Sequence, residues 1–232
     1  MTRNTITLND DIIEILTEGR IENNVFFMEG QLERKTYEVV NKALTILGGK
    51  WNRSAKGHVF EDDPTDRVVI QYLMDAAELR NDYNVLEPSA GHGAIAAVVH
   101  SEFPSATLTC IEIDAKKIPK LESRELGDVV CADFLTHDFG SAQFDCIVMN
   151  PPFSRQQDIE HVNRAYSLLA PKGRVVSIMS PGFTFRTDKK SMAFRELVEA
   201  HGSVSPLPVN SFTKSGTGVN SVLVTLNASQ RN

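Results

Sequence analysis

Short apolar runs alternate with amphipathic stretches from Pro64 onward. The runs are rich in β-branched residues, which is typical of buried strands, and the stretches between them have the spacing of helices with one apolar face. The expected strands are Asn84–Glu87, Ala106–Ile113, Asp128–Cys131, Phe144–Met149, Arg174–Met179, Val204–Val209 and Val219–Leu226. The expected helices are Thr65–Leu79, Ala94–Phe103, Ala115–Arg124, Asp158–Leu169 and Ser191–His201. This order predicts an α/β fold with a doubly wound, mostly parallel seven-stranded sheet that closes with an antiparallel edge hairpin.

The N-terminal part of the chain follows a different pattern. Asp10–Leu16 and Gln31–Leu47 have helical spacing, and Gly48-Gly49 ends the second of these helices. Trp51–Phe60 is polar and basic, and it is expected to form a hairpin or a loop. We therefore divide the chain into an extension, residues 1–60, which is a candidate for substrate contact, and a main domain, residues 61–232.

Composition narrows the class of protein. The 232 residues carry a net charge of −6 and are 41% hydrophobic, which fits a globular protein and excludes a disordered or collagen-like chain. No apolar stretch approaches the roughly 20 residues of a membrane helix, and Met1–Asp10 lacks the pattern of a secretory signal. We expect a cytoplasmic protein. Cys110, Cys131 and Cys146 each fall in an expected strand without metal-ligand spacing, so we expect buried free thiols and no metal.

Charge is unevenly distributed along the chain. Residues 31–58 contain six basic and two acidic residues, and residues 182–232 contain six basic and three acidic residues. These two basic segments flank an acidic centre. Such local surfaces can bind a polyanion although the whole protein is acidic.

Small and polar residues follow the first three expected strands of the main domain. Glu87 and the loop through Gly93 combine small residues with a following helix N-terminus, which lets a ligand carboxylate approach the backbone. Glu112 follows the next strand and can accept hydrogen bonds from ribose hydroxyls. Asp133-Phe134 follows the third, where it can accept from an amino group and stack on a purine. Taken singly, each cluster has an alternative explanation as an ordinary turn or an exposed charge.

The fourth cluster, Asn150-Pro151-Pro152-Phe153, is more specific. Two prolines fix φ and remove two amide donors, which leaves rigid carbonyl acceptors. Asn150 adds an amide oxygen, and Phe153 offers a flat face. The set suits a planar group that bears an NH2, although a proline-rich turn is the alternative.

In this order, the four clusters resemble the class I S-adenosylmethionine-dependent methyltransferases, and Asn-Pro-Pro-Phe resembles their amino-methylating branch. The resemblance covers roughly Pro64–Leu226 and implies S-adenosyl-L-methionine as cofactor. It implies catalytic roles for Asn150, Pro151, Pro152 and Phe153. The cofactor contacts it implies are Thr65, Glu87, Pro88, Ser89, Ala90, Gly91, Gly93, Glu112, Ile113, Asp133, Phe134 and Asn150.

The motif order further resembles the gamma arrangement of DNA adenine-N6 methyltransferases. That likeness implies base flipping, with Phe212 stacking on the base beside Phe153, and a nucleic acid as partner. The further substrate contacts it implies are Lys214, Lys50, Trp51 and Arg53. We expect methylation of adenine N6 in DNA at short or relaxed sites. An RNA base amine, a protein glutamine amide and a catalytically silent cofactor-binding module are the alternatives.

Overall fold

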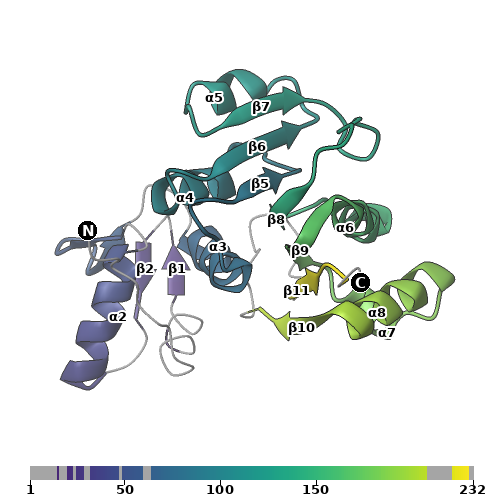
Figure 1. Ribbon diagram of the computed structural model, residues 1–232. Coiled ribbons are helices and arrows are strands. Elements are labelled where there is room, and N and C mark those ends of the chain that lie inside the picture. Colours follow the sequence, from purple (N-terminus) through teal and green to yellow (C-terminus); the bar gives the residue numbers. More distant parts are fainter. Residues whose placement is uncertain are drawn as a thin grey trace. The chain divides into compact units, whose positions relative to one another are not determined.

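The computed structural model describes residues 15, 20–22, 25–28, 32–46, 49–59, 64–207 and 221–229 (Figure 1). The chain forms two compact units, Met1–Val69 with Pro208–Val219, and Ile70–Leu207 with Asn220–Asn232. We call them the N-terminal unit and the main unit. The expected helix Asp10–Leu16 lies outside the described residues except for Ile15.

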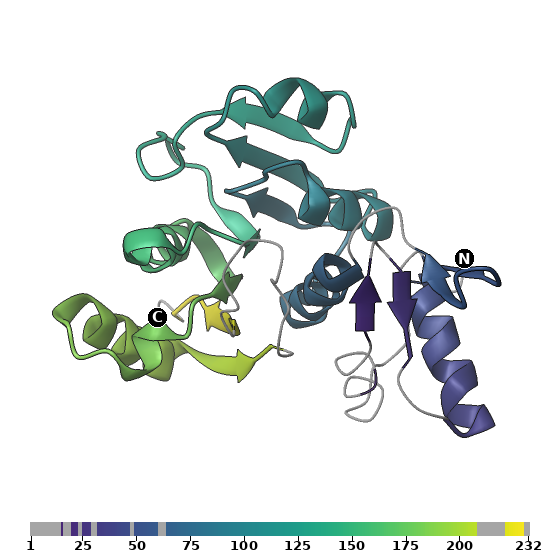
Figure 2. The same cartoon turned by 180° about the vertical axis from the view of Figure 1, so that it is seen from behind.

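The main unit is built on a seven-stranded sheet in the order β10-β11-β9-β8-β5-β6-β7 (Figures 1 and 2). Its strands are β5 Asn84–Glu87, β6 Thr107–Glu112, β7 Asp128–Cys131, β8 Phe144–Met149, β9 Leu169–Met179, β10 Gly202–Pro206 and β11 Val222–Asn227. Strands β7, β6, β5, β8 and β9 are parallel, whereas β11 is antiparallel to both β9 and β10. The expected doubly wound sheet with an antiparallel edge hairpin is confirmed.

The helices connect these strands in the expected alternation. They are α3 Pro64–Ala77, α4 Ala94–Glu102, α5 Ile118–Glu122, α6 Gln157–Ser167, α7 Gly182–Phe185 and α8 Lys189–His201, with the 3-10 turn η1 Ser154–Gln156 before α6. The strand order runs outward from β5 in one direction through β6 and β7, and in the other through β8 and β9. Since βαβ crossovers are right-handed, the two directions place their helices on opposite faces. Strand order therefore reverses between β5 and β8, where ligands bind in such sheets.

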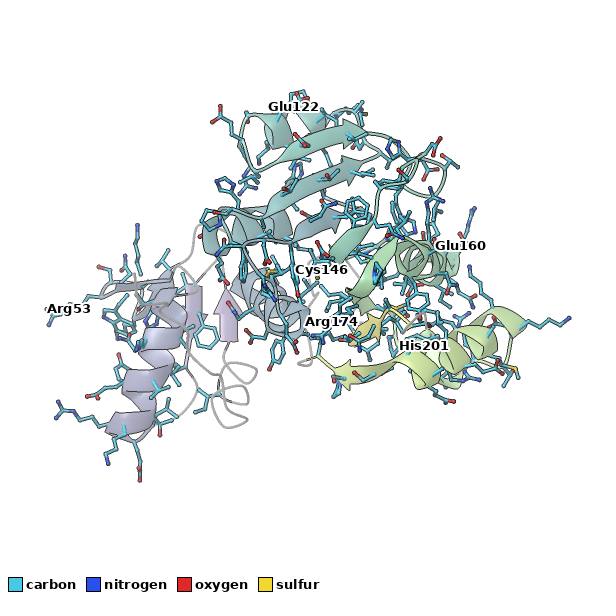
Figure 3. All side chains as sticks on the ribbon, viewed as in Figure 1. Arg53, Glu122, Cys146, Glu160, Arg174 and His201 are labelled. Atoms are coloured by element: carbon cyan, nitrogen blue, oxygen red, sulfur yellow. The ribbon has the colours of Figure 1, made fainter. Side chains whose placement is uncertain are left out.

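A continuous apolar core explains why the central strands form. In β8 the side chains of Cys146, Ile147, Val148 and Met149 are all buried, as expected for a parallel strand covered on both faces. Cys146, labelled in Figure 3, donates its thiol to the carbonyl of Ala77 at 3.8 Å. Cys110 is buried as well, but Cys131 is exposed, so that part of the cysteine prediction is wrong. Cys131 lies on β7, the last strand of the sheet order, which has less cover than the central strands.

Several elements of the main unit differ from the sequence-based expectation: α5 covers only Ile118–Glu122 of the expected Ala115–Arg124, and β10 is Gly202–Pro206 instead of Val204–Val209. Strand β9 begins at Leu169 rather than Arg174, and it passes through Lys172 with a φ of 68° and a register shift against β8. Helix α7 was not expected, because four residues are too few to establish a helical spacing.

The N-terminal unit contains a second, four-stranded sheet in the order β1-β2-β4-β3, with helix α2 Arg34–Ile46. Its strands are β1 Arg20–Glu22, β2 Val25–Phe27, β3 Lys50–Asn52 and β4 Gly57–Val59, and every pairing is antiparallel. The expected helix and the β3–β4 hairpin are present. The β1–β2 pair was not expected, because three-residue strands carry too little alternation to be recognised.

Candidate active site

The sheet brings the four polar clusters to one edge. Strand β5 pairs in parallel with β6 and β8, and β6 pairs in parallel with β7, so all four strands end on the same side. Backbone hydrogen bonds then join neighbouring loops. The Ala90 N–H donates to the Ile111 carbonyl at 2.9 Å, and the Ala132 N–H donates to the Glu112 carbonyl at 3.1 Å.

The loop after β5 requires glycine at two positions for different reasons. Gly91 has a φ of 57°, and a Cβ atom there would meet nothing within 4 Å. Gly93 has a φ of 78°, and its Cβ would lie 2.6 Å from Cδ1 of Leu121. Left-handed backbone favours glycine at both places. Gly93 is additionally required for packing, whereas Gly91 leaves open space at the surface of the loop.

Two side chains from the following elements hold this loop in place. Oε2 of Glu112 accepts the Gly91 N–H at 2.6 Å, and its Oε1 accepts the Asp114 N–H at 2.8 Å. Nη1 of Arg124 donates to the carbonyls of His92 and Gly93 at 2.6 and 3.0 Å. Sequence reasoning missed Arg124, because nothing in a lone exposed arginine indicates which carbonyls it reaches.

Glu87 is the most unusual ionisable group of this edge. Its side chain is 1% exposed, and Oε2 has no hydrogen-bond partner within the described part of the chain. Burial raises the pKa of Glu87 to about 8, with a further rise from Glu112, against the lowering effects of the Ala96 N–H and Arg124. A buried carboxyl oxygen without a donor is costly, so this atom fits a ligand that brings a cation or a hydrogen-bond donor.

The two residues expected to flank an adenine lie in opposite environments. Ile113, directly after β6, is 67% exposed, which places a large apolar side chain at the ligand edge. Phe134 is 2% exposed and packs edge-on against Phe139, with ring centroids 6.0 Å apart. Its ring therefore belongs to the core and positions the loop instead of facing a ligand. Asp133 is exposed, and its Oδ1 accepts the Leu135 N–H at 2.9 Å.

The Asn150–Phe153 segment leaves β8 at the point where the sheet order reverses. Asn150 and Pro152 are exposed, Pro151 is buried and Phe153 is half-buried. Directly after it, Arg155 and Gln156 have φ values of 55° and 59°. Two consecutive non-glycine residues in the left-handed region cost on the order of 1–3 kcal/mol each, and such strain is concentrated at functional sites.

Hydrogen bonds join Gln156 and Asp158, at and just after the strained backbone, to neighbouring elements. Nε2 of Gln156 donates to Oδ2 of Asp188 at 3.2 Å, which ties the segment to the N-cap of α8. Asp158, 3% exposed, accepts the Ser180 N–H through Oδ2 at 3.1 Å. Burial raises the pKa of Asp158, and the N–H groups of Ser180 and Ile159 partly oppose the rise. The segment is thus held from β9 and α8 in a fixed geometry.

The remaining expected contacts lie elsewhere in the chain. Lys50, Trp51 and Arg53 are exposed on the β3–β4 hairpin of the N-terminal unit, where the Trp51 ring meets the buried His58 edge-on at 5.3 Å. Thr65 lies in α3. Phe212 and Lys214 lie outside the described residues.

No cluster of three or more His, Cys, Asp or Glu side chains in the described part of the chain could hold a metal ion. Among the described helices, none has both the length and the apolar character needed to cross a bilayer. A hollow of about 160 Å³ lined by Tyr166, Leu169 and Ser229 lies at the opposite edge, near the amino end of β9, and is separate from the clusters.

The chain belongs to the methyltransferase small domain family, whose model matches residues 54–198. It is 27% identical over 106 residues to a release factor glutamine methyltransferase of Koribacter versatilis (strain Ellin345), which covers 44% of this chain and 38% of that protein. A release factor glutamine methyltransferase of Fusobacterium nucleatum is 27% identical over 131 residues, 51% of this chain and 37% of that protein. The chain therefore spans well under half the length of these curated relatives.

Solved structures with the same fold agree with this assignment. The methyltransferase subunit of a type I restriction-modification system from Streptococcus thermophilus superposes with a TM-score of 0.61 at 16% identity, over 88% of this chain and 52% of that one. TrmN from Thermus thermophilus gives a TM-score of 0.56 at 18% identity, over 86% and 70%. At these identities the likeness concerns the fold alone.

The chain therefore carries a methyltransferase small domain with the Rossmann-like fold of the class I methyltransferases, whose methyl donor is S-adenosyl-L-methionine. The residues at the sheet edge fit that donor. Its cationic groups match the unpartnered buried oxygen of Glu87, and its adenine matches the exposed Ile113. The open space beside Gly91 leaves room for the methionine part of the methyl donor, with its amino and carboxylate groups.

Proposed function

We propose that the protein transfers a methyl group to the exocyclic N6 amine of adenine in DNA. The observation that carries the proposal is the Asn150–Phe153 segment, held rigidly at the reversal point of the sheet beside the glycine loop. In this proposal Glu87, the loop from Pro88 to Gly93, Glu112, Ile113 and Asp133 hold the cofactor. Thr65, Asn150 and the backbone around Phe134 complete that set.

The acceptor chemistry explains why an asparagine and two prolines are needed. The lone pair of an adenine amine is delocalised into the ring, so the nitrogen is a poor nucleophile. The side-chain oxygen of Asn150 and the carbonyl of Pro151 would accept both N–H bonds and draw the nitrogen toward a tetrahedral geometry. When bound, the cofactor supplies an electrophilic methyl group on a sulfonium. Orientation and electrostatics then provide the rate, without a strong base.

The half-buried Phe153 would stack on the ring that bears the amine. In a duplex that ring must first leave the helix, at a cost of about a few kcal/mol. We propose Phe212 as the opposite face of the sandwich. Residues 1–60 would contact the nucleic acid through Lys50, Trp51 and Arg53, and residues 61–232 would form the catalytic domain. The reaction would take place in the cytoplasm.

The amide of a protein glutamine is a second candidate acceptor. The curated relatives named above act, by their names, on release factor glutamine, and a glutamine amide presents the same planar NH2. The exposed basic hairpin of the N-terminal unit favours a polyanion instead, since residues 31–58 carry a net charge of +4 in an acidic protein. RNA bases carry the same amine and remain a third acceptor to be tested.

Transfer of labelled methyl from S-adenosyl-L-methionine tests the proposal. Unmethylated duplex DNA, ribosomal RNA and a bacterial release factor are offered in parallel, and the products are digested and identified. We expect N6-methyladenine in DNA. Label only in RNA or only in glutamine would keep the methyltransferase and discard DNA as the acceptor. Cofactor binding without transfer to any acceptor would identify a silent module.

Matched variants separate catalysis from folding. Asn150→Ala is expected to lower kcat by about 100-fold or more, because it removes an acceptor that acts in the transition state. Its affinity for the cofactor, measured by calorimetry, should change far less. Asn163→Ala removes an exposed asparagine from α6 and serves as the control with unchanged transfer.

A further inference from the structure

Helix α7 presents an aromatic side chain to solvent. It follows β9, the neighbour of the strand that leads into Asn150–Phe153, which we call the acceptor segment. Phe185 is 71% exposed, more than any other large apolar side chain in the described part of the chain. Phe183, two residues earlier on the same short helix, is buried and meets Phe194 edge-on at 4.9 Å. Burying Phe183 therefore fixes the helix and leaves Phe185 on the outside. One exposed aromatic ring is not an apolar patch by itself, so the position of Phe185 and the charges near it decide what it can bind.

Hydrogen bonds hold helix α7, which carries Phe185, and the residues on either side of it. Nη1 of Arg195 donates to the carbonyls of Phe183 and Arg186 at 2.5 and 2.6 Å, so one guanidinium joins both ends of the short helix. Oγ1 of Thr184 donates to the Pro181 carbonyl at 2.8 Å. Phe185 is thus presented by a preorganised loop, and binding to it would cost little ordering entropy.

Residues 180 and 188, on either side of α7, are hydrogen-bonded to residues that closely follow the acceptor segment. Before α7, the Ser180 N–H donates to Asp158, at the start of α6, which directly follows the acceptor segment and η1. After α7, Asp188 accepts from Gln156, which lies three residues beyond Phe153. Strands β8 and β9 run in parallel and end at this edge. Phe185 therefore lies on a segment that is hydrogen-bonded to residues 156–158, shortly after the residues that would hold the amine, on the side away from the glycine loop in the strand order.

Exposed cations lie on the segments that these hydrogen bonds join. Arg155, Arg186 and Lys189 are exposed, and within the described residues no ion pair engages them. Among the acidic groups nearby, Glu160 pairs with Lys190 at 2.7 Å, whereas Asp188 keeps its negative charge while both its oxygens accept hydrogen bonds from Ser191. Three cations against this one carboxylate leave the surface with a net positive charge.

We propose that Phe185 stacks on a nucleobase adjacent to the one that is methylated, while Arg155, Arg186 and Lys189 contact the flanking phosphates. An exposed aromatic ring with arginine and lysine side chains nearby is suited to binding unpaired nucleic acid, because each base can stack on the ring and each nucleotide carries a phosphate. A glutamine-bearing peptide would need neither feature. This inference rests on a nucleic acid as the acceptor in the proposed function, and it adds the contact that holds the strand while one base is extruded.

Kinetics on nucleic acid acceptors test the inference. Phe185→Ala is expected to raise the KM for the acceptor by about 5- to 150-fold, the range that corresponds to the loss of one stacking contact. Its kcat and its affinity for the cofactor should stay near those of the wild type, and Phe185→Trp should retain the low KM. Met192→Ala, which removes an exposed apolar side chain from α8, is the matched control without effect.

Salt dependence supplies an independent readout. Arg155→Gln and Arg186→Gln should each reduce the slope of log affinity against log salt by about 0.7–0.9, one phosphate contact each. Unchanged KM in Phe185→Ala, with an active wild type on nucleic acid, would overturn the stacking role and leave the proposed function intact. A wild type that methylates only release factor would overturn both, and it would do so before any variant is made.

Discussion

The carboxylate of Glu112 and the backbone of Gly91 are joined by a hydrogen bond of 2.6 Å, across 21 positions of sequence. The residue expected to bind a ribose therefore also builds the loop expected to hold the methionine part of the same cofactor. Each carboxylate oxygen has a second lone pair, so Glu112 can hold the loop and accept from a ligand at once. Strands β5 and β6 are thereby coupled at the ligand edge.

Replacing Glu112 should damage cofactor binding more than folding. Glu112→Ala removes a charge-assisted acceptor from the Gly91 and Asp114 amides, and hydrogen bonds to charged groups contribute roughly 1.5–3 kcal/mol. We expect cofactor affinity to fall by about 10- to 150-fold in calorimetry. Glu112→Gln keeps one acceptor and should retain part of the affinity. Equal affinity in the wild type and Glu112→Ala would show that the loop keeps its shape without this carboxylate.

Glu87 should make both stability and cofactor binding depend on pH. The pKa of Glu87 is raised to about 8, so in the free protein the carboxyl keeps a proton that the unfolded chain releases at lower pH. Its contribution to stability is therefore fully present below the unfolded pKa of about 4.5, and it is lost as the pH rises through about 8. In Glu87→Gln this part of the pH dependence of urea unfolding should disappear.

Cofactor binding should show the opposite trend. A cation favours the ionised carboxylate, so binding displaces the proton from Glu87, and affinity should rise by up to about tenfold per unit between pH 6 and 7.5. Glu87→Gln should bind weakly and without this slope. Glu122→Gln, at the exposed end of α5 (Figure 3), is the matched control and should keep the wild-type slope. A wild-type affinity that is flat over this range would contradict the assignment of Glu87 to a cation.

Sequence patterns predicted the architecture because parallel strands leave a strong signal. The apolar, β-branched runs at β5 and β8 have the bounds that the structure gives them, and the polar clusters follow from where those runs end. The same reasoning could not separate Phe134, whose ring enters the core, from Ile113, which stays exposed. Ile113 directly follows β6 and Phe134 comes three residues after β7, and only the loop geometry decides which side chain turns inward.

Sequence patterns could not predict contacts that depend on how residues far apart in the chain come together. Arg124 reaches the glycine loop from 31 positions away, and Phe185 lies on a helix of four residues. The sequence also gives no sign of the strained backbone at Arg155 and Gln156, because neither residue type is typical of left-handed backbone. Each of these features is a property of how loops meet at the sheet edge.

The two glycines of the β5 loop should respond differently to alanine. Gly93→Ala combines a positive φ with a Cβ 2.6 Å from Leu121, and we expect a loss of about 2–4 kcal/mol in the free energy of unfolding. Gly91→Ala carries the φ penalty alone, about 1 kcal/mol. Its added methyl group fills the space proposed for the cofactor, so affinity should fall more than stability. Chemical denaturation and calorimetry on both variants measure the difference, and equal losses of stability would refute the packing argument.

Asp158 should reveal whether a hydrogen bond or a charge fixes the acceptor segment. Asp158→Ala leaves the partly buried Ser180 N–H without its acceptor, at a cost of about 1–3 kcal/mol in unfolding free energy. Asp158→Asn keeps the acceptor oxygen for Ser180 but replaces the oxygen that accepts the Ile159 N–H by an amide donor, so it should lose less stability at neutral pH than the alanine variant. Because Ser180 leads into α7 and Asp158 begins the helix after Phe153, kcat should fall in the alanine variant and be largely kept in the asparagine variant. If both variants lose stability and kcat alike, the charge of Asp158 is what the segment requires.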